Sequence, residues 1–249
     1  MVDQSGHSWS QPDWKKLRHA YGSAEDLPEL LEELDPDPES FVWNELWGRV
    51  CHQYSTFSAS PYVLPYLLAA ARGWEPEARV MPLTLAGGIV AAPETNLEGF
   101  TGVVEELGLL TRSTLDNANL GSQERVYVVQ AMMAFAGDRV WGHALDRLND
   151  GRFLAACPTC RTQLYVVIGD DAFCYVEDRV RRGEERRSVV TPVAPETLDG
   201  TGLALYTLCR ASADPAVGTS ICQLFGRATC PNCSQGFDVS EAVAAFENP

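Results

Sequence analysis

Apolar side chains recur at helical spacing from Asp13 to about Asn149, with short polar breaks between the segments. One segment carries a stripe with the i, i+3, i+4, i+7 spacing of a helix that has one buried side: Leu27, Leu30, Leu31 and Leu34. The stretch Asp35-Pro36-Asp37-Pro38 ends it, because each proline disfavours helical geometry in the residue before it. We expect helices over residues 13–21, 23–34, 41–50, 60–72, 77–91, 99–115, 122–136 and 138–149.

These short helices are expected to stack as antiparallel pairs, since each pair would cover the apolar face of its neighbour. The pairs recur at irregular intervals of roughly 25 to 45 residues, which is close to the spacing of helical-repeat proteins. Residues 1–150 are therefore predicted to form an α-helical solenoid. A compact irregular bundle would give the same periodicity and is the alternative that the pattern leaves open.

The pattern changes after Gly151. Residues 163–168 and 172–176 are rich in β-branched and aromatic side chains and flank a Gly-Asp-Asp turn, so we expect them to pair as a hairpin. Two helices, a strand and a last helix should follow at about 199–212, 215–225, 237–239 and after Ser240. The predicted fold class is mainly α, with residues 151–249 forming a small β module that carries an inserted helical pair.

Two short motifs of like sequence place candidate metal ligands in this module. Cys157-Pro158-Thr159-Cys160 and Cys230-Pro231-Asn232-Cys233 each hold two sulfurs in one tight turn, within reach of one ion. Together they would complete the tetrahedral shell of four sulfurs that zinc prefers. An iron–sulfur cluster, redox-active pairs and disulfides are alternatives for these cysteines.

The 69 residues between Cys160 and Cys230 exceed the roughly 15 to 20 of an ordinary zinc ribbon. Each motif nevertheless borders a β-like segment, as expected of a zinc ribbon split by an inserted helical pair. Four cysteines leave no position for a catalytic water, so the predicted Zn²⁺ is structural. The remaining cysteines lie in apolar sequence and are expected in the core: Cys51, Cys174, Cys209 and Cys222.

The chain of 249 residues has 19 Lys and Arg against 34 Asp and Glu, a formal net charge of −15. This balance disfavours generic nucleic-acid binding, which needs basic surfaces. Residues 1–150 carry −12 of the charge and residues 151–249 carry −3. Residues 25–39 contain acids without a base, and four of them are the predicted contacts for a basic protein partner: Glu29, Glu32, Glu33 and Asp35. A solvated face that serves solubility is the alternative.

The location of the protein is predicted from what the sequence lacks. No apolar run reaches the ~18 residues of a membrane span. The first residues, MVDQSGHSWSQPDW, have neither the basic nor the hydrophobic region of a signal peptide. We therefore expect a cytoplasmic protein without a membrane partner, in a reducing compartment that keeps its cysteines as thiols.

Parts of the chain resemble a known group of proteins. Three segments resemble the opening of HEAT-like helical-repeat proteins found widely in actinobacteria: Trp14–Pro28, His52-Gln53 and Pro61–Leu68. Two more are similar to a zinc-knuckle version of the same group: Cys157–Gly169 and Leu224–Cys233. The resemblance spans most of the chain and departs at Tyr54, where the group usually has glycine. It implies a helical solenoid with a zinc-ribbon-like C-terminal portion and the role of an interaction protein, such as an immunity or accessory protein.

The sequence therefore predicts a non-enzymatic protein-binding or accessory protein, either an immunity or inhibitor protein or a scaffold. It contains no nucleophile elbow, phosphate-binding loop or His-Glu-x-x-His pair. His52 is a weak catalytic candidate, because it lies in a polar segment where a neighbouring acid would make it a base. The alternative is thus a helical-repeat enzyme of a specialised pathway that uses a pocket around His52.

Overall fold

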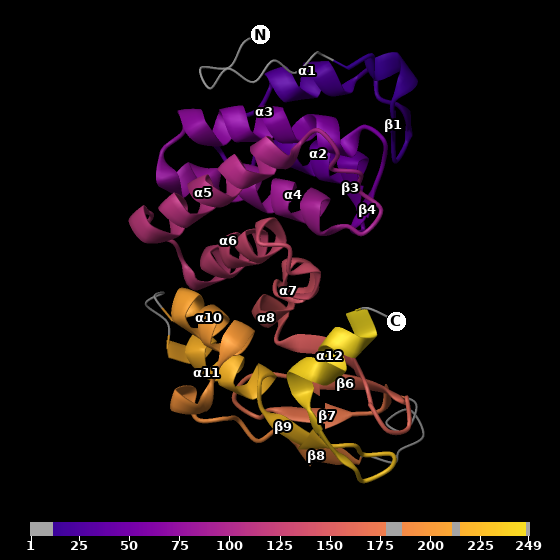
Figure 1. Cartoon of the computed structure of the whole chain (residues 1–249), viewed down its shortest axis with the longest axis vertical. Helices are drawn as coiled ribbons and strands as arrows, with labels where there is room; N and C mark the ends of the chain where they lie inside the picture. Colours follow the sequence, from indigo (N-terminus) through magenta and orange to yellow (C-terminus); the bar gives the residue numbers. More distant parts are fainter. Residues whose placement is uncertain (1–11, 178–185, 211–214, 248–249) are drawn as a thin grey trace.

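The computed structural model describes residues 12–177, 186–210 and 215–247. Its regular structure is mainly helical, as predicted, and the helices gather in the N-terminal part (Figure 1). The α-helices before the main sheet are α1 (Leu27–Glu32), α2 (Phe41–Val50), α3 (Ser60–Gly73), α4 (Val80–Ala91), α5 (Thr101–Asn117), α6 (Ser122–Phe135), α7 (Arg139–Ala144) and α8 (Arg147–Asp150). A 3₁₀ turn, η2 (Pro76–Arg79), leads into α4.

The first predicted helix, over residues 13–21, is wrong. A 3₁₀ turn, η1 (Trp14–Lys16), is followed by two short antiparallel strands, β1 (Arg18–His19) and β2 (Gly22–Ser23). The backbone N–H of Ala20 donates to Arg49 O at 2.9 Å, so the end of α2 satisfies a group that a local helix would have satisfied internally. The chain reverses at Ala20 and Tyr21, and Gly22, which follows them as the first residue of β2, has a φ of +136° that glycine adopts without steric cost.

A second short hairpin follows α2. Its strands are β3 (Cys51–His52) and β4 (Ser55–Thr56), and the two residues between them have φ values of +50° for Gln53 and +62° for Tyr54. Two successive left-handed residues give the type I′ turn that suits the twist of paired strands. Tyr54 thus stands at a position whose backbone favours glycine.

Helix α4 lies at the centre of the helical part. It is buried along nearly its whole length and contacts α2, α3, α5, α6 and α7. The Gly87-Gly88 pair does not interrupt it, and a Cβ on Gly87 would lie 2.6 Å from Ala131 Cα, so glycine permits the close approach of α4 to α6. In a solenoid each helical pair contacts only its neighbours. Because α4 contacts helices on several sides, the HEAT-like solenoid stays a prediction.

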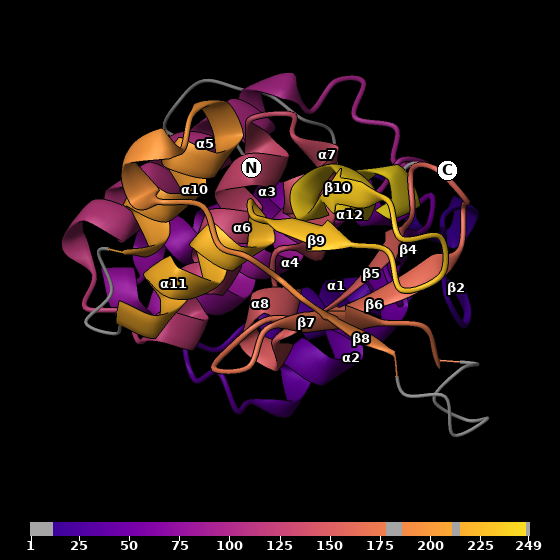
Figure 2. The same cartoon turned by 90° about the horizontal axis from the view of Figure 1, so that it is seen from below.

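The C-terminal part is built on a four-stranded antiparallel sheet in the order β5 (Arg152–Ala156), β6 (Gln163–Val167), β7 (Phe173–Tyr175) and β8 (Arg187–Val189). The predicted hairpin is confirmed as β6 and β7. A separate hairpin of β9 (Arg227–Thr229) and β10 (Gly236–Asp238) leads directly into α12 (Val239–Glu247). Figure 2 shows this hairpin and α12 on the same side of the sheet.

Two helices are inserted between the main sheet and the second hairpin, as predicted. They are α10 (Gly200–Cys209) and α11 (Pro215–Leu224), after the short turn η3 (Pro195–Thr197). Gln223 on α11 joins the insertion to the β6–β7 turn, because its side-chain amide accepts from Gly169 N at 2.9 Å and donates to Gly169 O at 2.8 Å. Isolated bridging between Thr191 and Arg227 continues the sheet toward β9.

Buried apolar residues form two clusters. One fills the space between α1, α2, α3, α4 and α5 and includes Trp43, Leu64 and Ile89. The other joins α6 and α7 to the sheet, α11 and α12, so that Val129 and Phe153 share one core. The second cluster therefore contains residues from both sides of the predicted boundary at residue 150, and the two-domain division stays a prediction.

Among the residues that the structure describes, no helix combines the length and the apolar character needed to cross a membrane. The N-terminal residues on which the expectation about targeting rests are mostly outside the described part of the chain. Cytoplasmic location stays a prediction.

Candidate metal centre

Each of the two cysteine motifs forms the turn between two antiparallel strands. Residues 157–160 connect β5 to β6, and residues 230–233 connect β9 to β10. The strand expected after each motif is present as β6 and β10, and β5 and β9 precede the motifs. A rigid paired strand on both sides therefore fixes the direction in which each turn presents its sulfurs.

The two turns have the same backbone hydrogen bonds. In the first, Cys157 N donates to Thr162 O at 3.0 Å and Arg161 N donates to Cys157 O at 2.9 Å. In the second, Cys230 N donates to Gln235 O at 2.8 Å and Ser234 N donates to Cys230 O at 2.9 Å. The residue after each motif is left-handed, with φ +59° at Arg161 and φ +63° at Ser234. The two similar motifs thus form turns with the same hydrogen bonds and the same left-handed residue.

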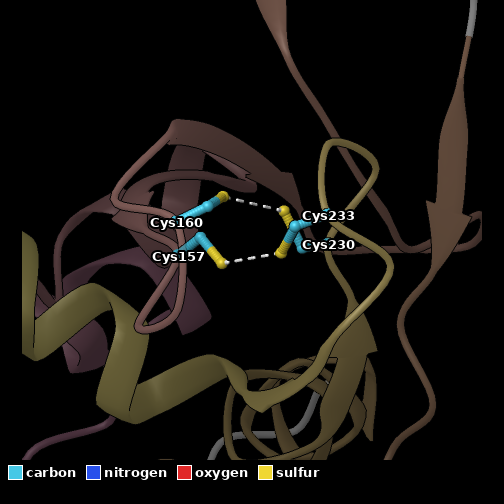
Figure 3. A group of neighbouring side chains, drawn as sticks. All are labelled: Cys157, Cys160, Cys230 and Cys233. Atoms are coloured by element: carbon cyan, nitrogen blue, oxygen red, sulfur yellow. Dashed lines mark hydrogen bonds between the residues drawn. The ribbon is translucent and has the colours of Figure 1, made fainter.

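The four sulfurs converge between the two hairpins (Figure 3). All four Sγ atoms lie within 4.8 Å of one another. Cys157 Sγ lies 3.7 Å from Cys233 Sγ, and Cys160 Sγ lies 3.8 Å from Cys230 Sγ. The cysteines come in pairs from segments that are 76 and 70 residues apart in the chain, and each close contact joins one motif to the other.

These separations fit one ion held by four sulfurs. A regular tetrahedron with metal–sulfur bonds of about 2.3 Å has sulfur–sulfur edges of about 3.8 Å. A disulfide would require about 2.05 Å, and an iron–sulfur cluster, which places several irons and sulfides between its ligands, holds the cysteines farther apart. The donor set and its spacing therefore suit a single tetrahedral metal ion, and all four predicted ligands meet at one point.

Polar neighbours surround the sulfurs. Asn232 N donates to Cys230 Sγ at 3.4 Å, and the Asn232 side-chain amide reaches Cys160 Sγ at 3.6 Å and Thr162 Oγ1 at 2.9 Å. The hydrogen bond with Thr162 lowers the pKa of the Cys160 thiol to about 5. Hydrogen bonds to thiolates hold ligands in place and stabilise the charged form that binds a metal.

The other cysteines are buried, as predicted, and none of them belongs to the group of four sulfurs. Cys51, Cys209 and Cys222 lie in apolar packing, and Cys174 lies under the sheet with its Sγ 3.5 Å from Thr229 O. Burial raises the pKa of Cys51 and of Cys209 to about 12 and that of Cys174 to about 11. The thiols of Cys51, Cys174 and Cys209 therefore stay protonated at neutral pH and are poor nucleophiles.

His52 lies on β3 beside an open hollow of about 320 Å³. Its ring is half-buried and meets the Tyr21 ring edge-on, with centroids 5.9 Å apart. The hollow is lined by Trp47, Gly48, Cys51, His52, Gln53 and Tyr54. None of these described side chains is a carboxylate, so the acid that would make His52 a base is not part of the lining.

The four predicted partner contacts are all exposed. Glu29 and Glu32 lie on α1, Glu33 caps its C-terminus, and Asp35 follows in the next turn. Trp43 Nε1 donates to Asp35 O at 3.1 Å, and Asp35 Oδ1 accepts from Asp37 N at 2.8 Å, so this turn is fixed to the core. The four residues lie on α1, at its C-terminal cap and in the turn that follows it, and α1 lies at the N-terminal end of the molecule (Figure 1). Whether they bind a partner stays a prediction.

A buried polar cluster was missed by sequence reasoning. Tyr54 OH donates to the half-buried carboxylate of Asp146, and Gln130 accepts from Asp146 N. Next to it, the Tyr54 and His143 rings meet with centroids 4.3 Å apart, and His143 Nδ1 lies 2.7 Å from Glu247 Oε2. Tyr54 and Asp146 are 92 residues apart, and no local spacing signals such a contact.

Comparison of the chain with protein-family models, with curated proteins and with solved structures found no match. The resemblance to HEAT-like proteins therefore stays a prediction, and the functional argument rests on the site itself.

Proposed function

We propose that the protein is a non-enzymatic binding or accessory protein whose C-terminal part is held together by one structural Zn²⁺ in a split zinc ribbon. The observation that carries the zinc assignment is the convergence of four sulfurs at tetrahedral spacing. Zinc suits this shell because it accepts four thiolates and needs no further ligand.

The chain supports a structural rather than a catalytic use of the metal. Four cysteines fill the coordination shell, so no position is left for a water or a substrate. The β9–β10 hairpin is short. Besides the metal centre, the bridge between Thr191 and Arg227, the hydrogen bond between Asn232 and Thr162, and packing join it to the rest of the C-terminal part. Binding at small zinc sites releases roughly 10 to 16 kcal/mol, which is comparable to the whole unfolding free energy of a domain, about 5 to 15 kcal/mol. The metal would therefore fix the hairpin and, through it, α12.

The proposed partner is a basic protein that binds the exposed carboxylates of Glu29, Glu32, Glu33 and Asp35. Such a surface attracts a basic partner and accelerates its association. An immunity or inhibitor protein and a scaffold are two forms of this role, in the cytoplasm and on a HEAT-like helical array. The rival, a helical-repeat enzyme that uses His52, lacks a carboxylate in the described lining of its hollow.

The test is recovery of the tagged, zinc-loaded chain from its own cells, with mass spectrometry of the proteins that come with it. The informative variant reverses three charges, Glu29→Lys, Glu32→Lys and Glu33→Lys, and leaves Asp35 in its turn. The matched control reverses three exposed acids elsewhere, Glu98→Lys, Glu105→Lys and Asp116→Lys.

We expect a basic protein that wild type and control retain and the α1 variant loses. A partner retained equally by all three would contradict the acidic surface. Retention of no protein, together with turnover of a small molecule that His52→Ala abolishes, would instead support the enzyme.

A further inference from the structure

The main sheet has one face that the rest of the described chain does not cover. Its inward side chains, such as Phe153, Leu164 and Cys174, are buried against α12 and the β9–β10 hairpin. The outward side chains alternate with them and are half-buried or exposed: Arg152, Leu154, Ala156, Gln163, Tyr165, Val167, Phe173, Tyr175, Arg187 and Val189. We call these residues the aromatic face. Val189, at the edge of the aromatic face, has 74% of its surface exposed to solvent.

Register places its members in two rows across the four strands. Arg152 pairs with Val167, Val167 with Phe173 and Phe173 with Val189. The second row runs through Leu154, Tyr165, Tyr175 and Arg187. Three aromatic rings therefore lie side by side, with an arginine at each end.

The rings and guanidinium groups contact one another in sequence across the face, and one pair of rings is stacked. The Tyr165 and Tyr175 rings are nearly parallel, with centroids 5.3 Å apart, and Phe173 follows Tyr175 at 5.8 Å. The guanidinium of Arg152 lies 4.5 Å from the Tyr165 centroid, and that of Arg187 lies 4.6 Å from the Phe173 centroid. Both arginines are exposed, and the Arg152 guanidinium also donates to Tyr175 OH.

A hollow of about 300 Å³ opens between the two arginines. Val167, Phe173 and Tyr175 line its apolar side, Arg152 and Arg187 line it with positive charge, and Asp150 and Gly151 complete it. This volume is at the lower end of small-ligand sites and suits one flat ring with an attached anionic group.

Charge distinguishes this face from the rest of the molecule. The outward-facing side chains of the described strands include two arginines and no acid, although the whole chain has a net charge of −15. Among the described residues, two acids lie at its edges: Glu177 accepts from Tyr165 OH at 2.7 Å, and Asp150 borders the hollow. An edge carboxylate accepts hydrogen bonds from the amino group of a base and repels phosphate.

We propose that the aromatic face binds a short stretch of single-stranded nucleic acid, one base of which enters the hollow between Arg152 and Arg187. Unpaired bases stack on aromatic rings and on guanidinium planes, and arginine also contacts the phosphates between them. Two arginines cannot bind a long phosphate backbone, so stacking supplies most of the affinity. The whole-chain charge excludes generic binding along a duplex and leaves this narrower mode.

The test is fluorescence anisotropy of the full zinc-loaded chain with labelled oligomers of about 12 nucleotides, as uridine RNA, as thymidine DNA and as a DNA duplex. We expect dissociation constants below about 100 μM for at least one single strand and at least tenfold weaker duplex binding, since duplex bases are already stacked. The RNA and DNA arms identify which strand is preferred.

Substitutions then locate the binding. Phe173→Ala should weaken binding between about fivefold and about a hundredfold, as expected for one lost stacking partner. Arg152→Gln and Arg187→Gln leave the apolar residues of the sheet unchanged, and each should weaken oligomer binding severalfold. The proposal is therefore testable even if Phe173→Ala does not fold. Arg112→Gln, an exposed arginine on α5, makes the same charge change elsewhere and should bind as wild type does. Log affinity should fall against log salt with a slope of about −1.4 for two neutralised phosphates.

Several results would overturn the proposal. These are the absence of binding to any single strand, equal binding by wild type and both arginine variants, or a salt slope steeper than about −4, which would require a larger basic surface. If no oligomer binds and Arg152→Gln or Arg187→Gln instead loses a protein partner, the face is a protein-binding surface and the proposal is wrong.

Discussion

The side-chain amide of Asn232 donates a hydrogen bond to Thr162 Oγ1 at 2.9 Å and so joins the two cysteine turns directly. The same amide reaches Cys160 Sγ at 3.6 Å. One residue between the second pair of ligands therefore positions a ligand of the first pair. Its identity matters although it is not itself a metal ligand.

Asn232→Ala should lower the zinc affinity by about tenfold to a hundredfold, which is the usual effect of removing an outer hydrogen bond from a metal site. Competition with a chromophoric chelator measures this. Thr159→Ala changes the equivalent exposed side chain of the first turn, for which no such bond exists among the described residues, and serves as control. An Asn232→Ala affinity equal to that of the control would mean that the amide does not support the site.

Ser234→Gly should stabilise the metal-bound protein by about 0.5–1 kcal/mol, because Ser234 has a φ of +63° that costs a side chain more than it costs glycine. Urea unfolding at constant zinc concentration measures the change. Thr159→Gly, at a position in the first turn without positive φ, should instead destabilise through the greater freedom of the unfolded chain. Destabilisation by both substitutions would show that the turn is not strained at Ser234.

Glu247 on α12 pairs with His143 and Arg147, and these contacts hold its pKa below the ordinary value against the opposing effect of burial. When the pKa of a carboxyl group is lower in the folded than in the unfolded protein, its ionised form stabilises the fold. This stabilisation is complete above the pKa of the unfolded chain, about 4.3, and is lost as pH falls through the pKa of the folded protein. Glu247→Gln should therefore cost about 2 kcal/mol at pH 7, and the difference from wild type should shrink in acid below that range.

Urea unfolding of wild type and Glu247→Gln across pH measures this, and comparing the two cancels the loss of metal that acid causes in both. Glu241→Gln, on the exposed side of the same helix, is the control and should change little. A difference that is constant from neutral pH to well below pH 4 would contradict the ion pair.

Asp146 should show the opposite pH dependence. Burial raises its pKa, and among the described residues its Oδ1 is buried without a hydrogen-bond partner. When the pKa of a carboxyl group is higher in the folded than in the unfolded protein, its protonated form stabilises the fold. This stabilisation is complete below the pKa of the unfolded chain, about 3.9, and is lost as pH rises through the pKa of the folded protein. Asp146→Asn keeps an oxygen that can accept from Tyr54 and should stabilise the protein by about 1 kcal/mol at pH 7.

The difference between Asp146→Asn and wild type, measured by urea unfolding, should disappear toward low pH. Asp116→Asn, an exposed acid on α5, should shift stability by less than about 0.5 kcal/mol. If Asp146→Asn destabilises at pH 7, the carboxylate is needed in its charged form and the argument from burial fails.

Local patterns predicted the features that local physics determines. The helix with the leucine stripe ends at Glu32, before Asp35-Pro36, because each proline disfavours helical geometry in the residue before it. It begins at Leu27 rather than at residue 23, because Ser23 pairs with Arg18 in the β1–β2 hairpin. The two C-P-x-C turns have the geometry that their internal sequences favour. The β6–β7 pairing follows from alternating β-branched and aromatic residues around a polar turn. Each of these contacts lies within about a dozen residues.

The features that sequence reasoning missed depend on distant contacts. Residues 13–21 are not helical because Ala20 bonds Arg49, and Tyr54 meets Asp146 across 92 residues. The segment expected as one helix over 138–149 forms two helices, α7 and α8. Gly151, with φ +63°, ends α8 at a position where a Cβ would clash with Ile168 O. The four cysteines were predicted to meet across a long insertion because two matching motifs indicate a shared ion. A single C-P-x-C motif would not have indicated one.

The measurement that tests the central claim most directly is zinc K-edge X-ray absorption of the purified full chain, supported by metal analysis. We predict one zinc per chain with a first shell of four sulfurs at about 2.3 Å, and loss of that signal in both Cys160→Ser and Cys233→Ser but not in Cys222→Ala. A shell with nitrogen or oxygen ligands, or unchanged zinc content in both serine variants, would contradict a shared four-cysteine centre.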